Sequence, residues 1–314
     1  MSPVESQHRS LSLPEGLAGS RVDQALARLF GLSRSAAVRV IEAGGVTVDG
    51  MVVDKAVRLD AGVWLEVVLP EPAPPAEFAI PEAVPGLEVL FSDEHLAVIS
   101  KPVGVAVHPS PGWTGPTVTA GLAALGHQLA SGGPPERQGI VHRLDVGTTG
   151  AMVVAKSERA YSQLKRAFAE RTVDKRYHAL VQGHPDPMSG TVDAPIDRHP
   201  TKDAIFAVVA GGKPSVTHYE TLEAFPAVTL LEIGLETGRT HQIRVHMSAL
   251  RHPCAGDLTY GADPKLAAKL GLTRQWLHAR QLSFTHPASG ERVTFAADYP
   301  DDLVNALAIV RHEA

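Results

Sequence analysis

The stretch GIVHRLDVGTTGAMVVAKS, residues 139–157, places a polar segment between two apolar runs. One acidic residue, Asp145, stands after the letters HRL and before a run of glycine and hydroxyl side chains. The apolar flanks, residues 140–145 and 150–157, are both predicted to be strand-like. The polar segment is therefore expected where a buried strand ends, and functional side chains often project from such places.

The chemistry of this stretch depends on which side chains share a face. If residues 140–145 form a strand, Arg143 and Asp145 point to one face and His142 to the other. A carboxylate close to a guanidinium group favours its ionised form, so Asp145 would be available as a nucleophile or a base. The alternative is a structural Arg–Asp pair at the end of a strand.

The composition is that of a soluble globular protein large enough for two domains. The chain has 314 residues, a formal net charge of −5 and 44% hydrophobic residues. No apolar run approaches the roughly 20 residues of a membrane-spanning helix, and the N-terminus lacks the apolar stretch of a signal peptide. The single cysteine, Cys254, excludes an intrachain disulfide and a cysteine-based zinc site. We predict a cytoplasmic protein.

The N-terminal part is predicted to be a small module of two helices and a hairpin. Apolar residues at helical spacing predict a helix over 22–30, and Ser33 is expected to cap a second helix over 34–43. Asp49-Gly50 between two β-branched runs is a strong hairpin signal. We place this first domain at residues 19–69.

A change of composition separates this module from the rest of the chain. Six prolines fall within residues 70–86, and proline at that density favours an extended spacer, so we predict a linker there. In the second domain, residues 87–314, predicted strands are not regularly separated by helices. The fold class is therefore predicted to be α+β, with Ser157 capping one of the helices.

Two further segments carry candidate site residues. In KRYHALV, Tyr177 is either a core residue whose hydroxyl binds a neighbour or a surface on which a flat heterocycle stacks. In LETGRTHQIRVHMSAL, Arg239 and Arg244 flank the expected start of a helix at about Thr240, which would form an anion-binding corner.

Other classes of site have weak support in the sequence. His241 and His246 are five residues apart, which does not stack them on one helix face, and no third ligand accompanies them, so no metal site is predicted. The chain lacks GxxxxGK[ST], GxGxxG after its first strand, and GxSxG. A nucleotide cofactor and a serine nucleophile are therefore not expected.

Two basic runs stand out against the acidic average. Residues 21–39 hold four arginines, among them Arg34 and Arg39, against one acid, and residues 165–176 hold five basic residues against two acidic ones. Each run is either a phosphate-binding surface or an ordinary solvated helix face.

Six blocks of the second domain, in order, resemble those of the RluA-type pseudouridine synthases. The residues 19–68 similarly resemble the S4-type RNA-binding domain. The resemblance implies a mixed, mainly antiparallel sheet with a central cleft, preceded by an RNA-binding module. One departure is Thr149, which stands where the family usually has serine. The six blocks are VHRLDVGTTGAMVVAKS, KPVGVAVHP, KRYHALV, TGRTHQIRVH, HPCAGDLTYG and LHARQLSFTHP.

The resemblance assigns a role to each candidate residue. It implies that Asp145 is the catalytic carboxylate, that Tyr177 stacks on the target base and helps to remove its C5 proton, and that Arg244 pairs with Asp145. Arg143 is implied to fill the space left by the extruded base. Arg239 is expected to bind substrate, and so are Arg34 and Arg39 on the small module.

The implied activity is the isomerisation of uridine to pseudouridine, most simply in large-subunit (23S) ribosomal RNA and less so in tRNA. The reaction needs no cofactor or metal, and the partner would be ribosomal RNA or a pre-ribosomal particle. Members of this family are generally monomers, so the resemblance implies a monomer. Whether the aspartate attacks the sugar or abstracts a ribose proton stays open at this point. The alternatives are a non-catalytic RNA-binding assembly factor and a hydrolase in which Asp257 supplies a second acid.

Overall fold

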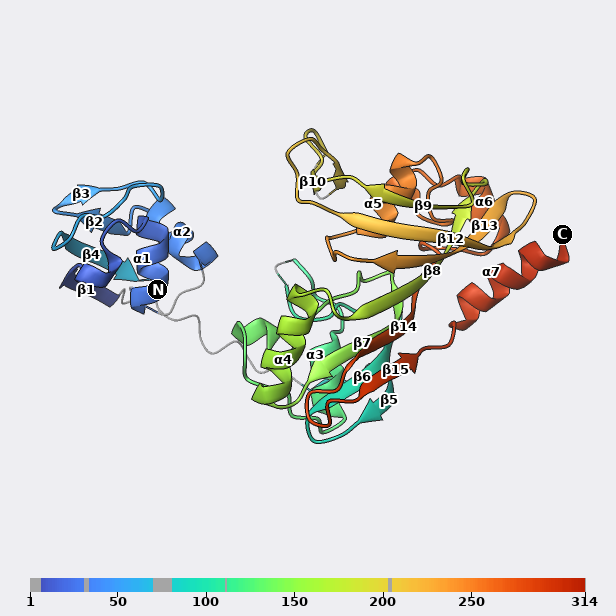
Figure 1. Cartoon of the computed structure of the whole chain (residues 1–314), viewed down its shortest axis with the longest axis horizontal. Coiled ribbons are helices and arrows are strands. Elements are labelled where there is room, and N and C mark those ends of the chain that lie inside the picture. Colours follow the sequence, from blue (N-terminus) through green and yellow to red (C-terminus); the bar gives the residue numbers. More distant parts are fainter. Residues whose placement is uncertain (1–6, 31–33, 70–80, 111, 203–204, 314) are drawn as a thin grey trace. The chain divides into compact units, whose positions relative to one another are not determined.

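The computed structural model describes residues 7–30, 34–69, 81–110, 112–202 and 205–313, without the side chains of residues 7, 34–36 and 39. The described residues form two compact units, one before residue 70 and one after residue 80 (Figure 1). Each of the five buried apolar clusters lies wholly within one unit. Each unit is therefore stabilised by its own core.

The first unit packs two helices against a small sheet. Its strand order is β1-β4-β2-β3. The hairpin at Asp49-Gly50 is confirmed, since both residues have positive φ, 49° and 79°, as a two-residue turn of this kind requires. The predicted cap Ser33 lies outside the described residues. The elements are β1 (Gln7–Ser12), α1 (Val22–Phe30), α2 (Arg34–Glu42), β2 (Val46–Val48), β3 (Met51–Val52) and β4 (Trp64–Leu69).

The second unit is built on one long sheet in the order β5-β6-β7-β14-β8-β13-β12-β9, with β15 also paired to β14. Among the described strands, only β7 and β14 pair in parallel, so the predicted mixed and mainly antiparallel α+β fold is confirmed. The strands are β5 (Glu88–Ser92), β6 (Leu96–Lys101), β7 (Thr149–Ala155), β8 (Asp174–Gln182), β9 (Ser189–Asp193), β12 (Val216–Ala224), β13 (Val228–Leu235), β14 (Leu277–Thr285) and β15 (Arg292–Ala296), with a separate pair β10 (Ile196–Arg198) and β11 (Phe206–Val208).

Helices cover the sheet of the second unit at both of its ends. In Figure 1, α3 and α4 lie near β6 and β7, and α5 and α6 lie near β12 and β13. As predicted, Ser157 caps α4: its hydroxyl accepts a hydrogen bond from the Ala160 amide at 3.3 Å. None of the described helices is long and apolar enough to cross a membrane. The helices are α3 (Val118–Ala124), α4 (Glu158–Ala169), α5 (Gln242–Ala249), α6 (Pro264–Lys269) and α7 (Asp301–His312).

Two expectations about the second unit need correction. Residues 140–145 are not a strand but an extended loop, joined to the sheet by a single bridge at Ile140. The ring of His142 accepts a hydrogen bond from the Val153 amide at 3.0 Å, so a side chain replaces the backbone acceptor that a strand would supply. In addition, Val84 is buried against the core of the second unit. That unit therefore begins by residue 81, earlier than the predicted residue 87.

The sheet branches at β14, and this branch positions the functional loop. The first residues of β14 lie between β7 and β8, with His278 opposite Thr149 and Leu277 opposite Ala179. Gly150 permits the close approach, because its φ is +115° and a Cβ there would lie 2.3 Å from the Ala279 oxygen. The loop that carries Asp145 therefore ends at the centre of the sheet.

Candidate active site

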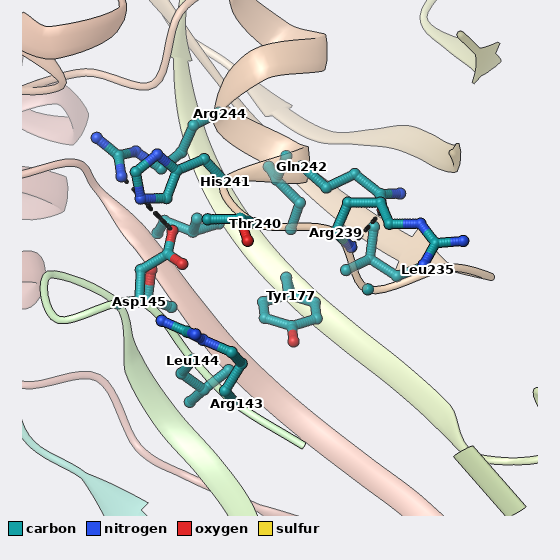
Figure 2. A pocket seen from close by; sticks show the side chains of 14 residues that line it. Arg143, Leu144, Asp145, Tyr177, Leu235, Arg239, Thr240, His241, Gln242 and Arg244 are labelled. Carbon is teal, nitrogen blue, oxygen red and sulfur yellow. Dashed lines mark hydrogen bonds and ion pairs between the residues drawn. The ribbon is translucent and has the colours of Figure 1, made fainter. Parts of the chain in front are cut away.

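A pocket at this centre collects five side chains that the sequence singled out. They come from three separate segments: the loop before β7, strand β8, and the connection from β13 together with the first turn of α5 (Figure 2). These residues are Arg143, Asp145, Tyr177, Arg239 and Arg244. The predicted cleft is thus present, and the residues are brought together although up to 101 positions separate them (Arg143 to Arg244).

The Asp145 carboxylate faces the start of α5. Its Oδ2 lies 3.5 Å from Nη1 of Arg244 and 3.9 Å from Nε2 of His241, and Figure 2 shows both side chains directed at it. The Arg244 guanidinium supplies a positive charge beside the carboxylate. At these distances Asp145 is oriented by its neighbours, and its carboxylate still faces the pocket.

Arg244 is itself held by a second carboxylate behind the pocket. Its Nε and Nη2 donate to the two oxygens of Asp257 at 2.6 and 2.9 Å, and its guanidinium lies 4.7 Å from the centre of the Tyr260 ring. Although burial opposes the charge, the hydrogen bond and charge of Asp257 and the charge of Asp145 raise the pKa of Arg244. Arg244 therefore stays charged and keeps Nη1 for Asp145.

This arrangement argues against a carboxylate-pair hydrolase. Asp257 is buried, with an exposed fraction of 2%, and does not line the pocket. Both of its oxygens accept hydrogen bonds from Arg244. Asp257 is thus a partner of Arg244, and it is not placed as a second acid for the reaction.

Tyr177 lies across the pocket from α5, on a buried position of β8. No described residue forms a hydrogen bond with its hydroxyl, so the interpretation as a core tyrosine satisfied by a neighbour is not supported. Burial, reinforced by the charge of Asp145, raises the pKa of Tyr177, which keeps the phenol neutral. With Leu235 and Leu277 beside it, the ring offers an apolar wall to a flat ligand.

A buried lysine, Lys101, contacts the loop that carries Asp145. Lys101, at the end of β6, is completely buried, and its Nζ donates to the carbonyls of Pro102, Val105 and Val146 at 2.9, 2.8 and 3.3 Å. Burial lowers the pKa of Lys101 to about 7, against the opposing charge of Asp145. The contact with Val146 ties the residue after Asp145 to the neighbouring strand.

The other side of the loop is anchored to the segment that leads into β14. Arg274 donates to the Gly147 carbonyl at 2.9 Å, and Gln275 donates to the Thr148 hydroxyl at 3.3 Å. Arg274 also forms a two-point ion pair with Asp302 at 2.7 and 2.9 Å. Since Asp302 belongs to α7, the C-terminal helix helps to fix the loop.

Thr149 has a structural partner of its own. Its hydroxyl lies 2.8 Å from Nδ1 of His278, whose Nε2 lies 3.1 Å from the Ala297 carbonyl. A carbonyl accepts only, so Nε2 donates to it and Nδ1 accepts from Thr149. Burial lowers the pKa of His278 to about 4, in agreement with a neutral ring. The threonine methyl is accommodated, since Thr149 has an exposed fraction of 2%.

The remaining candidate residues either lie at the edge of the pocket or have side chains that the structure does not describe. Arg143 is exposed, and Nε of Arg239 donates to the Pro214 carbonyl at 3.2 Å. Helix α5 begins two residues later than predicted, and His241 precedes it with φ of 57°. The side chains of Arg34 and Arg39 lie outside the described residues.

The histidines near α5 have ordinary partners. His246 lies 2.8 Å from the Thr217 hydroxyl and 3.0 Å from the Ala194 carbonyl. His241 contacts the Tyr260 hydroxyl at 2.8 Å as well as Asp145. Within the described part of the chain, no group of three or more histidine, cysteine or acidic side chains is arranged to hold a metal. From the sequence, His241 was interpreted only as a possible metal ligand, and its position in the pocket was therefore not predicted.

Comparison with known proteins assigns the family. The RNA pseudouridylate synthase family model matches residues 95–249, and the S4 domain model matches residues 20–65. An uncharacterised RNA pseudouridine synthase of Mycobacterium bovis is 60% identical over 97% of this chain and 99% of its own length. The ribosomal large subunit pseudouridine synthase D of Nitrosomonas europaea is 44% identical over 96% of this chain and 88% of its own.

A solved structure supports the same assignment. Human RNA pseudouridylate synthase domain containing 4 superposes with a TM-score of 0.56 at 30% identity, over 71% of this chain and 93% of the human chain. The chain therefore belongs to the RNA pseudouridylate synthase family, as a pseudouridine synthase with an N-terminal S4 domain.

Proposed function

We propose that this enzyme isomerises specific uridines in the RNA of the large ribosomal subunit (23S rRNA). The support is the similarity to the ribosomal large subunit pseudouridine synthase D of Nitrosomonas europaea, together with the S4 domain, a type of module that binds RNA. A substrate of this kind places the protein in the cytoplasm. The enzyme acts as a monomer on ribosomal RNA or a pre-ribosomal particle.

The reaction rearranges one nucleotide without adding or removing atoms. The bond from N1 of uracil to C1′ of ribose breaks, the base rotates, and a bond from C5 to C1′ forms. One proton leaves C5 and one is gained at N1, so neither a redox cofactor nor a co-substrate is consumed. The reacting atoms lie inside a base stack, and the nucleotide must first be flipped into the pocket.

The observation that carries the proposal is the placement of Asp145 opposite Tyr177 in one pocket. With the uracil ring stacked on Tyr177, the ribose would lie toward Asp145. The carboxylate either attacks C1′ or removes a ribose proton, and both routes require it to be ionised. Arg244 supplies the positive charge beside the carboxylate and fixes its orientation.

The other predicted residues bind the RNA in this proposal. Arg143 is exposed beside Asp145, where it fills the space that the flipped base leaves in the stack. Arg239, at the opposite edge of the pocket, binds the backbone of the RNA. Arg34 and Arg39 of the S4 domain supply further phosphate contacts, which position the RNA without reading its sequence.

Tritium release from C5-labelled uridine in an unmodified large-subunit rRNA transcript tests the proposal, with the wild type compared with Asp145→Asn. The substitution keeps the shape of the side chain and removes its charge. We expect release by the wild type and a loss of at least about 10³-fold in the variant, at unchanged RNA affinity.

Three other outcomes would overturn parts of the proposal. Equal release by both proteins would remove Asp145 from the chemistry. Release of free uracil with the tritium retained in it would indicate hydrolysis. RNA binding without turnover by the wild type would indicate an assembly factor in place of an enzyme acting on this RNA.

A further inference from the structure

A second hollow continues from the active-site pocket between α4 and β8. It shares Arg143, Tyr177 and Arg239 with that pocket. Along the described side chains that line it, five cations face a single acidic residue, Glu236. We call this hollow the basic groove. Its cations are Arg143, Lys165, Arg171, Lys175 and Arg239.

Lys175 differs from the other cations of the basic groove. Its exposed fraction is 9%, and no described residue forms a hydrogen bond or ion pair with its ammonium group. The adjacent carboxylate, Asp174, instead pairs with Arg176 at 3.1 Å, and Glu236 lies 3.4 Å from Arg171. Lys175 is therefore a buried cation without a counter-ion in the described structure.

A buried cation without a counter-ion raises the free energy of the folded protein when no RNA is bound. Burial, followed by the charge of Arg171, lowers the pKa of Lys175, and only the charge of Asp174 opposes this shift. Moving an ammonium group out of water costs free energy unless a partner compensates. Since the fold offers no partner, an anion from outside is the group that would complete the site.

The position of Lys175 defines which anion could reach it. Lys175 and Tyr177 both point to the buried face of β8 and are two residues apart, a step of about 7 Å along the strand. An anion at Lys175 would thus lie next to a base stacked on Tyr177. Arg143 and Arg171 line the same groove, so the site could contact several oxygens of one anion.

We propose that Lys175 is the centre of a phosphate-binding subsite that takes the RNA phosphodiester adjacent to the flipped uridine. This inference rests on the proposed RNA substrate. The partly desolvated ammonium group gains a counter-ion when the phosphate arrives, so part of the binding free energy is directed to the nucleotide in the pocket. Lys175 thus helps to hold the RNA backbone while the base is extruded.

The test compares three variants of the full-length protein on the unmodified large-subunit rRNA transcript. Lys175→Met removes the charge and keeps the length of the side chain, and Lys175→Arg retains the charge. Arg166→Gln is the matched control, because Arg166 is exposed on α4, does not line the basic groove, and its loss changes the net charge equally. The dissociation constant is measured from 50 to 300 mM KCl.

For Lys175→Met we expect a dissociation constant raised about tenfold, as for the loss of one charged hydrogen bond, and a salt slope reduced by about 0.7 to 0.9. Lys175→Arg and Arg166→Gln should stay within about threefold of the wild type. The melting temperature of Lys175→Met should equal or exceed that of the wild type, because an uncompensated buried charge is removed.

Two results would overturn the subsite. If Lys175→Met and Arg166→Gln have the same RNA affinity and the same salt slope, Lys175 does not contact a phosphate. A lowered melting temperature together with lower affinity would indicate a structural lysine. If the wild type binds the transcript but does not isomerise it, the proposed function fails while the affinities still test the subsite.

A measurement on the wild type avoids any dependence on folded variants. Labelling with acetic anhydride, read by mass spectrometry, should modify Lys175 in the free protein and much less at saturating RNA. Lys269 of α6, which pairs with Glu313, serves as the reference and should not change. Equal labelling of Lys175 with and without RNA would contradict the proposal.

Discussion

Arg244 shows how one residue can couple a buried scaffold to a reacting group. Two of its nitrogens bind Asp257, and the third faces Asp145. The planar guanidinium makes this division possible, since its donors have a fixed fork geometry. The orientation of Asp145 therefore depends on a carboxylate that never meets the substrate.

We expect Asp257→Asn to destabilise the protein by about 3 kcal/mol, because it leaves a buried guanidinium without its main counter-ion. Turnover should fall by about 10² because Arg244 is no longer fixed. Urea unfolding and tritium release measure the two effects. Turnover equal to that of the wild type would show that Asp257 does not position Arg244.

The double variant Arg244→Met with Asp257→Asn isolates the interaction. Its loss of unfolding free energy should be smaller than the sum of the two single losses, since the unpaired charge is removed in the double variant. Additive losses would show that the pair is not coupled.

We expect His278 to make the free energy of unfolding depend on pH. Its folded-state pKa of about 4 lies below the ordinary value of 6.5, because burial disfavours the charged ring. As the pH falls from 6.5 to about 4, the unfolded chain binds a proton that the folded chain does not. The free energy of unfolding should therefore fall, by up to about 1.4 kcal/mol per pH unit from this residue.

The variant His278→Gln removes this part of the pH dependence and keeps a donor for the Ala297 carbonyl. Urea unfolding between pH 4.5 and 7, followed by circular dichroism, should give a shallower slope in the variant. His142, whose pKa burial lowers to about 3, remains as a second source of slope in both proteins. Identical slopes would mean that His278 does not stay neutral in the fold.

At the residue scale, sequence motifs predict those groups that sit in short, ordered blocks. Asp145, Tyr177 and Arg244 were found in this way, and they line one pocket. The environment of Lys175 and the role of Asp257 were not predicted. Both depend on which segments the folded chain brings together, and this information is absent from local spacing.

Among the elements, β14 is packed tightly against β7, because it approaches β7 through Gly150. A Cβ at that position would lie 2.3 Å from the Ala279 oxygen, while a Cβ at Gly290 would meet nothing within 4 Å. Both glycines have positive φ, 115° and 75°. Gly290 therefore provides a control that carries the backbone strain without the collision.

We expect Gly150→Ala to lose at least about 3 kcal/mol of unfolding free energy and nearly all turnover, since β7 and β14 must separate. Gly290→Ala should lose only about 1 kcal/mol and retain turnover. Thermal unfolding and tritium release distinguish the two variants. Similar small losses in both would show that the strands adapt easily.

Periodicity predicted the helices α1 and α2 and the strand β7, and its main error is instructive. Residues 140–145 were predicted to be a strand, and Leu144 is buried while its neighbour Arg143 is exposed. Alternation describes an extended backbone, whereas a strand also needs a partner for its hydrogen bonds. His142 supplies one of those bonds from its side chain, which no local pattern reveals.

On the scale of the whole molecule, the two units have separate cores, and the entire pocket belongs to the second. A fragment that begins at residue 79 should therefore fold and isomerise the rRNA transcript. Its KM should rise by about 10² or more, because the S4 domain no longer raises the local concentration of RNA. The free S4 domain added separately should not restore the KM. A fragment with an unchanged KM would show that the S4 domain does not raise the local concentration of RNA.

The position of β14 in the sheet also has a consequence for biosynthesis. Asp145 precedes β7 and Tyr177 lies on β8, but these two strands are joined only through β14, which starts at residue 277. A ribosome releases the chain from its N-terminus onward, so the strand that unites the two sides of the pocket is among the last segments to emerge. The nascent enzyme would thus remain inert beside the very kind of RNA it modifies until its synthesis is nearly complete.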